Sequence, residues 1–242
     1  APLAVAVALS FSGSPFMSFP PRDLTFDWYI QLLDDGEFLR SLWFSVLLAL
    51  AATCLSLALG LPAAFALSRT RFPGKGLVQS FLLSPLIFPV LISGLALLKM
   101  FSAAGMTHAG WNLLLAHSVI ILPYVIRTVT ASLQLVDLSL EDAARTLGAN
   151  RWVTFYRITA PQIAPGVAAG ALFAFMVSLD NFPISMWLST TQYNPLPMLL
   201  YQRITRLFGP SIAAMSTLMI LVGILAVIII ERLVGVRKAM GV

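Results

Sequence analysis

Long apolar runs divide this sequence and place the strongest constraint on its fold. They cover residues 41–67, 77–98, 111–133, 166–188 and 211–230. A helix needs about 20 apolar residues to cross a bilayer, and each of these runs has about that length. Residues 1–11 form a shorter run, which we expect to be the outer end of a first span whose beginning precedes this sequence. The sequence therefore predicts an all-α, polytopic membrane protein with six transmembrane helices in one domain, residues 1–242, the first helix being incomplete at its N-terminus.

The composition agrees with a membrane protein. Hydrophobic residues make up 59% of the chain, charged residues only 10%, and the mean hydropathy is +0.90, whereas soluble domains carry about 25% charged residues. The net charge of +5 is explained by orientation and lipid headgroups, so we expect no nucleic-acid partner. Cys54 is the single cysteine, and His108 and His117 stand apart. We therefore expect neither a disulfide framework nor a metal site.

The distribution of basic residues predicts the orientation. One side of the membrane would hold nine or, with Arg127, ten of them: Arg69, Arg71, Lys75, Arg145, Arg151, Arg157, Arg232, Arg237 and Lys238. The other side would hold five: Arg22, Arg40, Lys99, Arg203 and Arg206. Because basic residues are enriched in cytoplasmic loops, the first side is predicted to be cytoplasmic. Both termini would then lie in the cytoplasm of a bacterium, with the protein in its inner membrane.

The longest polar interruption between spans, residues 137–161, belongs to this cytoplasmic side. Ser139 is a candidate helix N-cap, and Glu141 and Asp142 would lie in the first turn, where the helix dipole favours acids. Gly148 would stop this helix in a left-handed conformation. A second helical run would begin near residue 151 and end at Pro161. The pattern indicates a helix, a turn and a second helix held at the bilayer surface; we call residues 137–161 the knuckle.

The spacing within the knuckle resembles the EAA loop of permease subunits of binding-protein-dependent (type I) ABC importers. That pattern is an acid, two alanines, three residues, glycine, nine residues, Ile, one residue, Leu, Pro. The matching positions are Asp142, Ala143, Ala144, Gly148, Ile158 and Pro161. Asp142 replaces the usual Glu, with Glu141 beside it, and Ala160 replaces the usual Leu. The resemblance implies that these six residues, together with Glu141, form a coupling helix that docks on an ATP-hydrolysing subunit.

The resemblance also implies partners and a substrate class. The segments RTRFPGKG, SLDNFPISMWLS and NPLPMLLYQRITRLFGPSIAAMSTLMI are similar to the spermidine/putrescine-type subfamily. Iron, thiamine and aminophosphonate importers are the alternatives. The implied partners are a second permease, making a heterodimer, two ATP-binding subunits, a periplasmic or extracellular substrate-binding protein and the lipid bilayer. ATP and Mg²⁺ would be bound by the partner ATPase, so this chain would need no cofactor of its own.

Asp180 is the acid that the sequence places well inside a predicted span. A charged carboxylate in hydrocarbon costs at least about 2.5 kcal/mol on insertion scales, so it should face a cavity or a partner. Asn181 follows it, Pro183 leaves a backbone carbonyl without its usual donor, and Trp187 lies further along. Together Asp180, Asn181 and Trp187 would suit an ammonium ligand through charge pairing and cation–π contact. The alternative is that Asp180 pairs with a subunit interface and never meets substrate.

Other classes of function have weaker support in the sequence. The nucleotide-binding pattern G-x-x-x-x-G-K-[ST] is absent, so this chain does not bind ATP through that motif. An intramembrane enzyme needs convergent polar groups, and among the candidates His117 lies on a different predicted helix from Asp180 and Asn181. A small channel would not need the knuckle. We therefore predict a transport subunit with no catalytic residues, rather than an enzyme or a channel.

Overall fold

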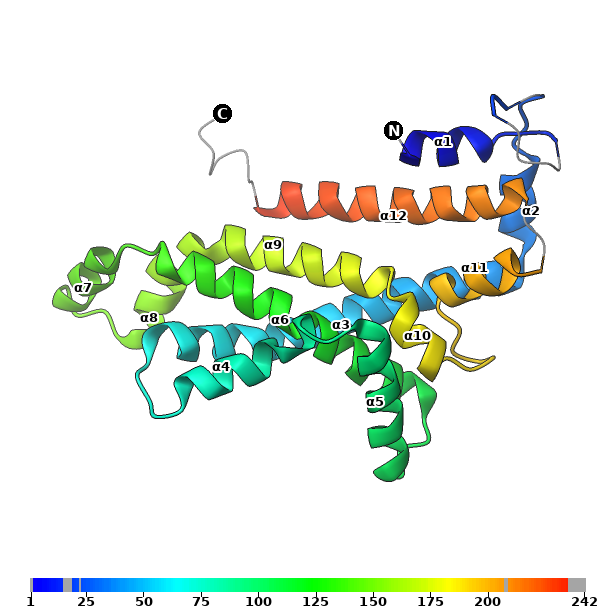
Figure 1. Cartoon of the computed structure of the whole chain (residues 1–242). Coiled ribbons are helices and arrows are strands. Elements are labelled where there is room, and N and C mark those ends of the chain that lie inside the picture. The colour runs from blue at the N-terminus through cyan, green and yellow to red at the C-terminus, as the bar shows by residue number, and fades with distance from the viewer. Residues whose placement is uncertain (1, 15–18, 22, 207–208, 235–242) are drawn as a thin grey trace.

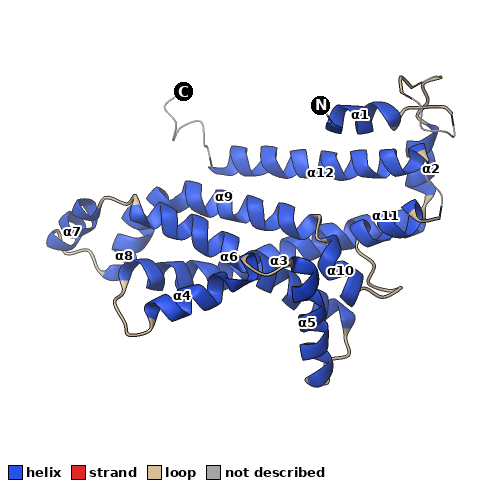
Figure 2. Cartoon of the chain, viewed as in Figure 1, coloured by secondary structure: helices blue, strands red, loops and turns tan. Residues whose placement is uncertain are grey.

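The structure is a computed structural model that describes residues 2–14, 19–21, 23–206 and 209–234. Most of this part of the chain is helical (Figure 2), and its β-structure is limited to an isolated bridge between Ser12 and Leu24. Three of the basic residues counted for orientation, Arg22, Arg237 and Lys238, lie outside the described residues. The helices in chain order are α1 (Pro2–Leu9), α2 (Asp27–Asp34), α3 (Gly36–Arg69), α4 (Lys75–Leu83), η1 (Ser84–Leu86), α5 (Val90–Ala103), α6 (Ala109–Gln134), α7 (Leu138–Thr146), α8 (Arg151–Thr154), η2 (Phe155–Thr159), α9 (Ala160–Leu179), α10 (Phe182–Leu188), α11 (Leu196–Ile204) and α12 (Pro210–Val234).

Four stretches in the described chain are long and apolar enough to cross a membrane. They are α3, α6, the continuous helical stretch Arg151–Leu179 and most of α12. The pair formed by Lys75–Leu86 and Val90–Ala103 adds a fifth span if the two bent halves are counted together. α1 has only eight residues. The all-α membrane fold is therefore confirmed, whereas the predicted count of six spans is not.

The predicted third span, residues 77–98, is broken rather than continuous. Its two halves, α4–η1 and α5, meet at an angle of 107°. Pro85 lies at the start of η1 and Pro89 caps α5. Each proline lacks a backbone N–H and restricts the residue before it, so the helix cannot run straight through both. As a result α5 projects away from the bundle (Figure 1).

The predicted fifth span, residues 166–188, has different boundaries and also contains a break. The helical stretch begins already at Arg151 and ends at Leu179, with Asp180 as its C-cap. Asn181 then caps α10 by accepting a hydrogen bond from the Ile184 amide at 3.2 Å. The prediction that Asp180 lies well inside a span is therefore wrong. The residue lies at the break, where an Asn cap and Pro183 in the next first turn restart the helix.

The knuckle also differs in detail from its prediction. Asp137, not Ser139, is the N-cap of α7, and its carboxylate accepts the Ser139 amide at 2.9 Å. Pro161 does not end the second helix, which continues into α9 through the single π turn η2. In that turn the Ala160 amide bonds to the carbonyl of Phe155, five residues earlier. This wider turn shifts the hydrogen-bond register just before Pro161, so the missing proline N–H lies in the first turn of α9.

The core lies where α3, α6 and α9 pack together. Its apolar side chains include Ile121 and Val125 of α6 and Ala174 of α9. α6 and α9 approach closely, because a Cβ at Gly166 or Gly170 would overlap the side chains of Ser132 and Thr128. α12 lies beside α9, and α1 beside α12 (Figure 1). α7 and α8 lie at one end of this bundle and α2 and α11 at the other, so the knuckle stands apart from the opposite end.

Candidate functional site

Local caps shape the knuckle. α7 starts at the Asp137 cap, and hydrogen bonds from the Ser139 hydroxyl and amide lower the pKa of Asp137 below its usual 3.8. Gly148 has a φ of 87°, which confirms the left-handed stop. Asn150 then caps α8, where its side-chain oxygen accepts the Val153 amide at 2.9 Å. Two short helices thus meet at a defined turn.

Glu141 fastens the knuckle to two transmembrane helices. Its side chain is 7% exposed, and one carboxylate oxygen accepts hydrogen bonds from Arg69 Nη2 at 2.9 Å and Thr159 Oγ1 at 2.8 Å. Arg69 is the last residue of α3, and Thr159 ends the π turn before α9. Any displacement of α7 therefore acts on the ends of α3 and α9 together. Arg69 and Thr159 are functional candidates that sequence reasoning missed, since Arg69 entered only the count for orientation and the segment RTRFPGKG, and neither residue was predicted to contact Glu141.

The opposite surface of the knuckle is exposed and largely apolar. Leu147 is 89% exposed, Trp152 72% and Tyr156 66%, and the rings of Trp152 and Tyr156 stack with centroids 6.3 Å apart. Of the other sequence-predicted coupling residues, Asp142, Ala143, Gly148 and Pro161 are exposed, and Ala144 and Ile158 are half-buried. The Asp142 carboxylate lies 3.6 Å from Arg145 Nη1 of its own helix. This surface has the aromatic and aliphatic side chains of a protein-docking site.

The two helix breaks meet at a cleft of about 440 Å³ on the side of α6. The first break contributes Pro85, Leu86, Phe88 and Val90, the second Met176, Val177, Asp180, Asn181 and Pro183, and α6 contributes Ile120 and Tyr124. Asp180 is the acid among these residues and forms no ion pair within the described chain. The cleft can therefore offer a carboxylate and an aromatic ring to a cationic group.

The structure brings together only part of the predicted substrate site. Asp180 and Asn181 both line the cleft, although the Asn181 side-chain oxygen is engaged in capping α10. Trp187 lies elsewhere: its indole Nε1 donates to the Leu91 carbonyl at 3.0 Å, and its ring packs over Gly94 of α5. Trp187 thus ties α10 to α5 instead of lining the cleft. Phe88 and Tyr124, which the sequence did not single out, supply the aromatic rings.

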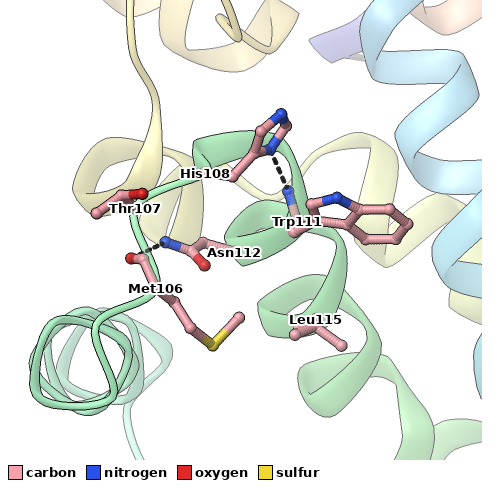
Figure 3. Close-up of a pocket in the computed structure, with 6 residues that line it drawn as sticks. All are labelled: Met106, Thr107, His108, Trp111, Asn112 and Leu115. Atoms are coloured by element: carbon pink, nitrogen blue, oxygen red, sulfur yellow. Dashed lines mark hydrogen bonds between the residues drawn. The ribbon is translucent and has the colours of Figure 1, made fainter.

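A second cleft, of about 310 Å³, lies at the link between α5 and α6 (Figure 3). His108 caps α6, where its Nδ1 accepts the Trp111 amide at 3.3 Å, and the Asn112 side-chain amide donates to the Met106 carbonyl at 3.1 Å. Both side chains are therefore engaged in hydrogen bonds to nearby backbone groups. The described residues include no group of three or more His, Cys, Asp or Glu side chains placed to hold a metal ion.

Comparison with known proteins gives consistent matches. Residues 38–237 match the family described as "Binding-protein-dependent transport system inner membrane component". The spermidine/putrescine transport system permease protein PotC of Haemophilus influenzae is 30% identical over 233 residues, which cover 96% of this chain and 90% of the relative. The putrescine transport system permease protein PotI of Escherichia coli K12 is 33% identical over 229 residues, 91% of this chain and 80% of the relative. The molybdenum transport system permease protein ModB of the same strain is 37% identical over 169 residues, 63% of this chain and 72% of the relative.

Solved structures agree on the fold. A bacterial ABC transporter involved in the import of the acidic polysaccharide alginate superposes with a TM-score of 0.67 at 20% identity, covering 97% of this chain and 89% of that one. The inward-facing MetNI methionine ABC transporter superposes with a TM-score of 0.70 at 16% identity, covering 88% and 99%. The family match covers most of the sequence, and the fold agrees with it. The chain therefore belongs to the binding-protein-dependent transport system inner membrane components, the permease subunits of type I ABC importers.

Proposed function

We propose that this permease imports polyamines such as spermidine and putrescine, and that ATP hydrolysis in partner subunits drives it through the knuckle. The observation that carries the coupling role is the double attachment of Glu141 to Arg69 and Thr159. A force applied to the exposed face at Leu147 and Trp152 would pass through this joint into α3 and α9. Both helices pack against α6, whose Ile120 and Tyr124 line the cleft.

The chemistry of the cleft supports a cationic substrate. Asp180 is its acid and Phe88 and Tyr124 are its aromatic rings, and an ammonium group pairs with a carboxylate and with an aromatic face. PotC and PotI match nearly the whole chain; by name, PotC is a permease of spermidine/putrescine transport and PotI of putrescine transport. ModB, a permease of molybdenum transport, matches a smaller part. A negatively charged oxyanion would be repelled by Asp180, so the cleft favours the polyamine assignment.

The proposal includes an assembly in the inner membrane, with the knuckle and both termini in the cytoplasm. A second permease would complete the pathway from the other side of the cleft, since one wall of Asp180 and Tyr124 cannot enclose a diamine. Two ATP-binding subunits would dock on the knuckles, and a substrate-binding protein would deliver the polyamine to the opposite end, near α2 and α11. ATP and Mg²⁺ would be held by the ATP-binding subunits.

Uptake by the whole complex tests both the polyamine substrate and the dependence on ATP hydrolysis. The complex, purified with its partner subunits and substrate-binding protein and reconstituted into vesicles, should take up radiolabelled putrescine or spermidine only with ATP on the ATPase side. Unlabelled molybdate should not compete. Uptake of molybdate, or polyamine uptake that needs no ATP, would contradict the assignment.

A further inference from the structure

His117 is a buried ionisable side chain that the proposed function leaves without a role. It lies on α6 and is 1% exposed. Its Nδ1 is 2.9 Å from Ser178 Oγ of α9, and its Nε2 has no hydrogen-bond partner. Either tautomer therefore leaves one buried ring nitrogen unpaired, which is unfavourable in a core. An apolar side chain of similar volume would fill this space without that penalty, so packing alone does not account for a histidine here.

Ser178 is placed where α9 ends. Its backbone carbonyl accepts hydrogen bonds from the amides of both Asp180 and Asn181, the two residues at the break. Val177, Asp180 and Asn181 around it line the cleft. The position of Ser178 therefore fixes the start of the break and, through it, the backbone that carries Asp180.

The hydroxyl of Ser178 behaves differently from other hydroxyls on the same helices. Those of Ser118 and Thr128 on α6 donate to carbonyls four residues earlier in their own helix, at 2.7 and 2.9 Å. Ser178 Oγ instead pairs with His117 on the neighbouring helix. This bond joins α6 to α9 close to the point where α9 stops.

We infer that His117 is a positioning residue for the cleft: through Ser178 it holds the Asp180–Asn181 break against α6 and so sets the place of the Asp180 carboxylate. Ile120 and Tyr124, one and two turns further along α6, form the facing wall. The bond thus fixes the distance between that wall and the acid. This role rests on the proposed path through the cleft, and it requires no contact between His117 and the substrate.

The first test separates binding from turnover in the reconstituted complex. Ser178→Ala and His117→Leu each remove the bond, and both should raise the half-saturating putrescine concentration for uptake by roughly ten-fold while the maximal rate changes less. His117→Asn places an amide group near the lost Nδ1 and should restore most of the affinity. Ser118→Ala removes a neighbouring buried hydroxyl that bonds only within α6, and should leave uptake as in the unsubstituted protein.

The second test reports on the break itself and does not depend on transport. With Cys54 replaced by serine, Asp180→Cys offers one thiol to a small methanethiosulfonate reagent. Adding Ser178→Ala should raise its labelling rate several-fold, and adding Ser118→Ala should not. Unchanged labelling, or an unchanged half-saturating concentration in Ser178→Ala, would overturn the inference. Normal polyamine uptake by Asp180→Asn would instead overturn the proposed path, while the labelling result would still decide the role of His117.

Discussion

In the knuckle, Glu141 is buried against Arg69 and Thr159, whereas in the cleft Asp180 is exposed and has no ion-pair partner in the described chain. The two carboxylates thus differ in whether the described chain provides them with a partner. Glu141 is satisfied within its own chain, so it can hold helices together at a fixed geometry. Asp180 is left open, so its charge is available to a ligand or to a partner subunit. Glu141 is therefore suited to transmit a displacement between helices, and Asp180 is suited to bind a cationic group.

The backbones of the knuckle and of the cleft differ in a way that matches these two roles. The knuckle is built from caps at Asp137 and Asn150 and a left-handed glycine at 148, and its helices continue through a π turn into α9. The cleft is built from breaks, at residues 87–89 and at residues 180–181, where helices stop and restart. A connected element moves as a unit, while breaks let helix halves move separately. The knuckle is therefore suited to deliver a displacement and the cleft to respond to one.

The largest effect should follow from removing the Glu141 joint. Glu141→Ala leaves Arg69 partly buried without its partner, and breaking a buried ion pair costs about 3–5 kcal/mol. Because the Arg69 side chain is 17% exposed, we expect about 2–3 kcal/mol. Thermal unfolding of the purified complex should show this loss, and ATP-driven uptake should fall with it. Asp142→Ala, at a side chain that is 75% exposed, should change stability by less than about 0.5 kcal/mol; equal losses in the two variants would contradict the joint.

At Asp180 we expect uptake to fall without a loss of stability. Asp180→Asn keeps the size of the side chain but removes the charge, so polyamine uptake should fall by at least about ten-fold. Stability should be unchanged, since Asp180 is exposed and the substitution breaks no ion pair within the described chain. Uptake and thermal unfolding of the same preparation measure both. Asp34→Asn, an exposed acid at the end of α2, is the matched control; a similar loss there would show that uptake responds to charge in general.

A smaller effect is expected at Gly148, where it should come from the left-handed backbone and not from steric crowding. Gly148 has a φ of 87°, and Gly76 at the start of α4 has no positive φ; a Cβ at either would meet nothing within 4 Å. Gly148→Ala should therefore cost about 1–2 kcal/mol through conformation alone, and weaken retention of the ATP-binding subunit in a pull-down. Gly76→Ala should cost nothing, because alanine favours a helix. Equal retention by both variants would mean that the turn at Gly148 does not shape the docking surface.

The sequence predicted what depends on local chemistry. Apolar length gave the membrane helices, and the spacing around Asp142 and Gly148 gave the knuckle and its left-handed turn. The apolar run of residues 77–98 predicted a third span, but not that its two halves would be bent by 107°, since an angle depends on what each half packs against.

What the sequence did not predict depends on contacts between distant residues. Arg69 and Glu141 are 72 positions apart, and His117 and Ser178 are 61 apart, so no local pattern links them. Trp187 was grouped with Asp180 because the two are close in sequence. The break at residues 180–181 redirects α10, and Trp187 reaches α5 instead. The cleft itself exists only because two separate breaks converge on α6.

The smallest expected effect concerns the cap that starts the knuckle. Hydrogen bonds from Ser139 lower the pKa of Asp137 below 3.8 in the folded chain. A carboxyl whose folded pKa is lowered stabilises the fold above its unfolded pKa and loses that contribution as the pH falls through the folded value. Protection of α7 amides from hydrogen exchange should therefore weaken below pH 3.8.

Asp137→Asn provides the comparison that isolates this cap. Asparagine keeps the acceptor oxygen but does not titrate, so its α7 protection should be independent of this group at every pH. Near neutral pH the unsubstituted protein should be as well protected as the variant or better, because a charged acid at a helix N-terminus is favourable. The ratio of exchange rates between the two proteins, measured peptide by peptide over residues 138–146, cancels the intrinsic pH dependence of exchange. A ratio that stays constant as the pH falls below 3.8 would mean that the charge of Asp137 does not stabilise α7 and that its cap works through the acceptor oxygen alone.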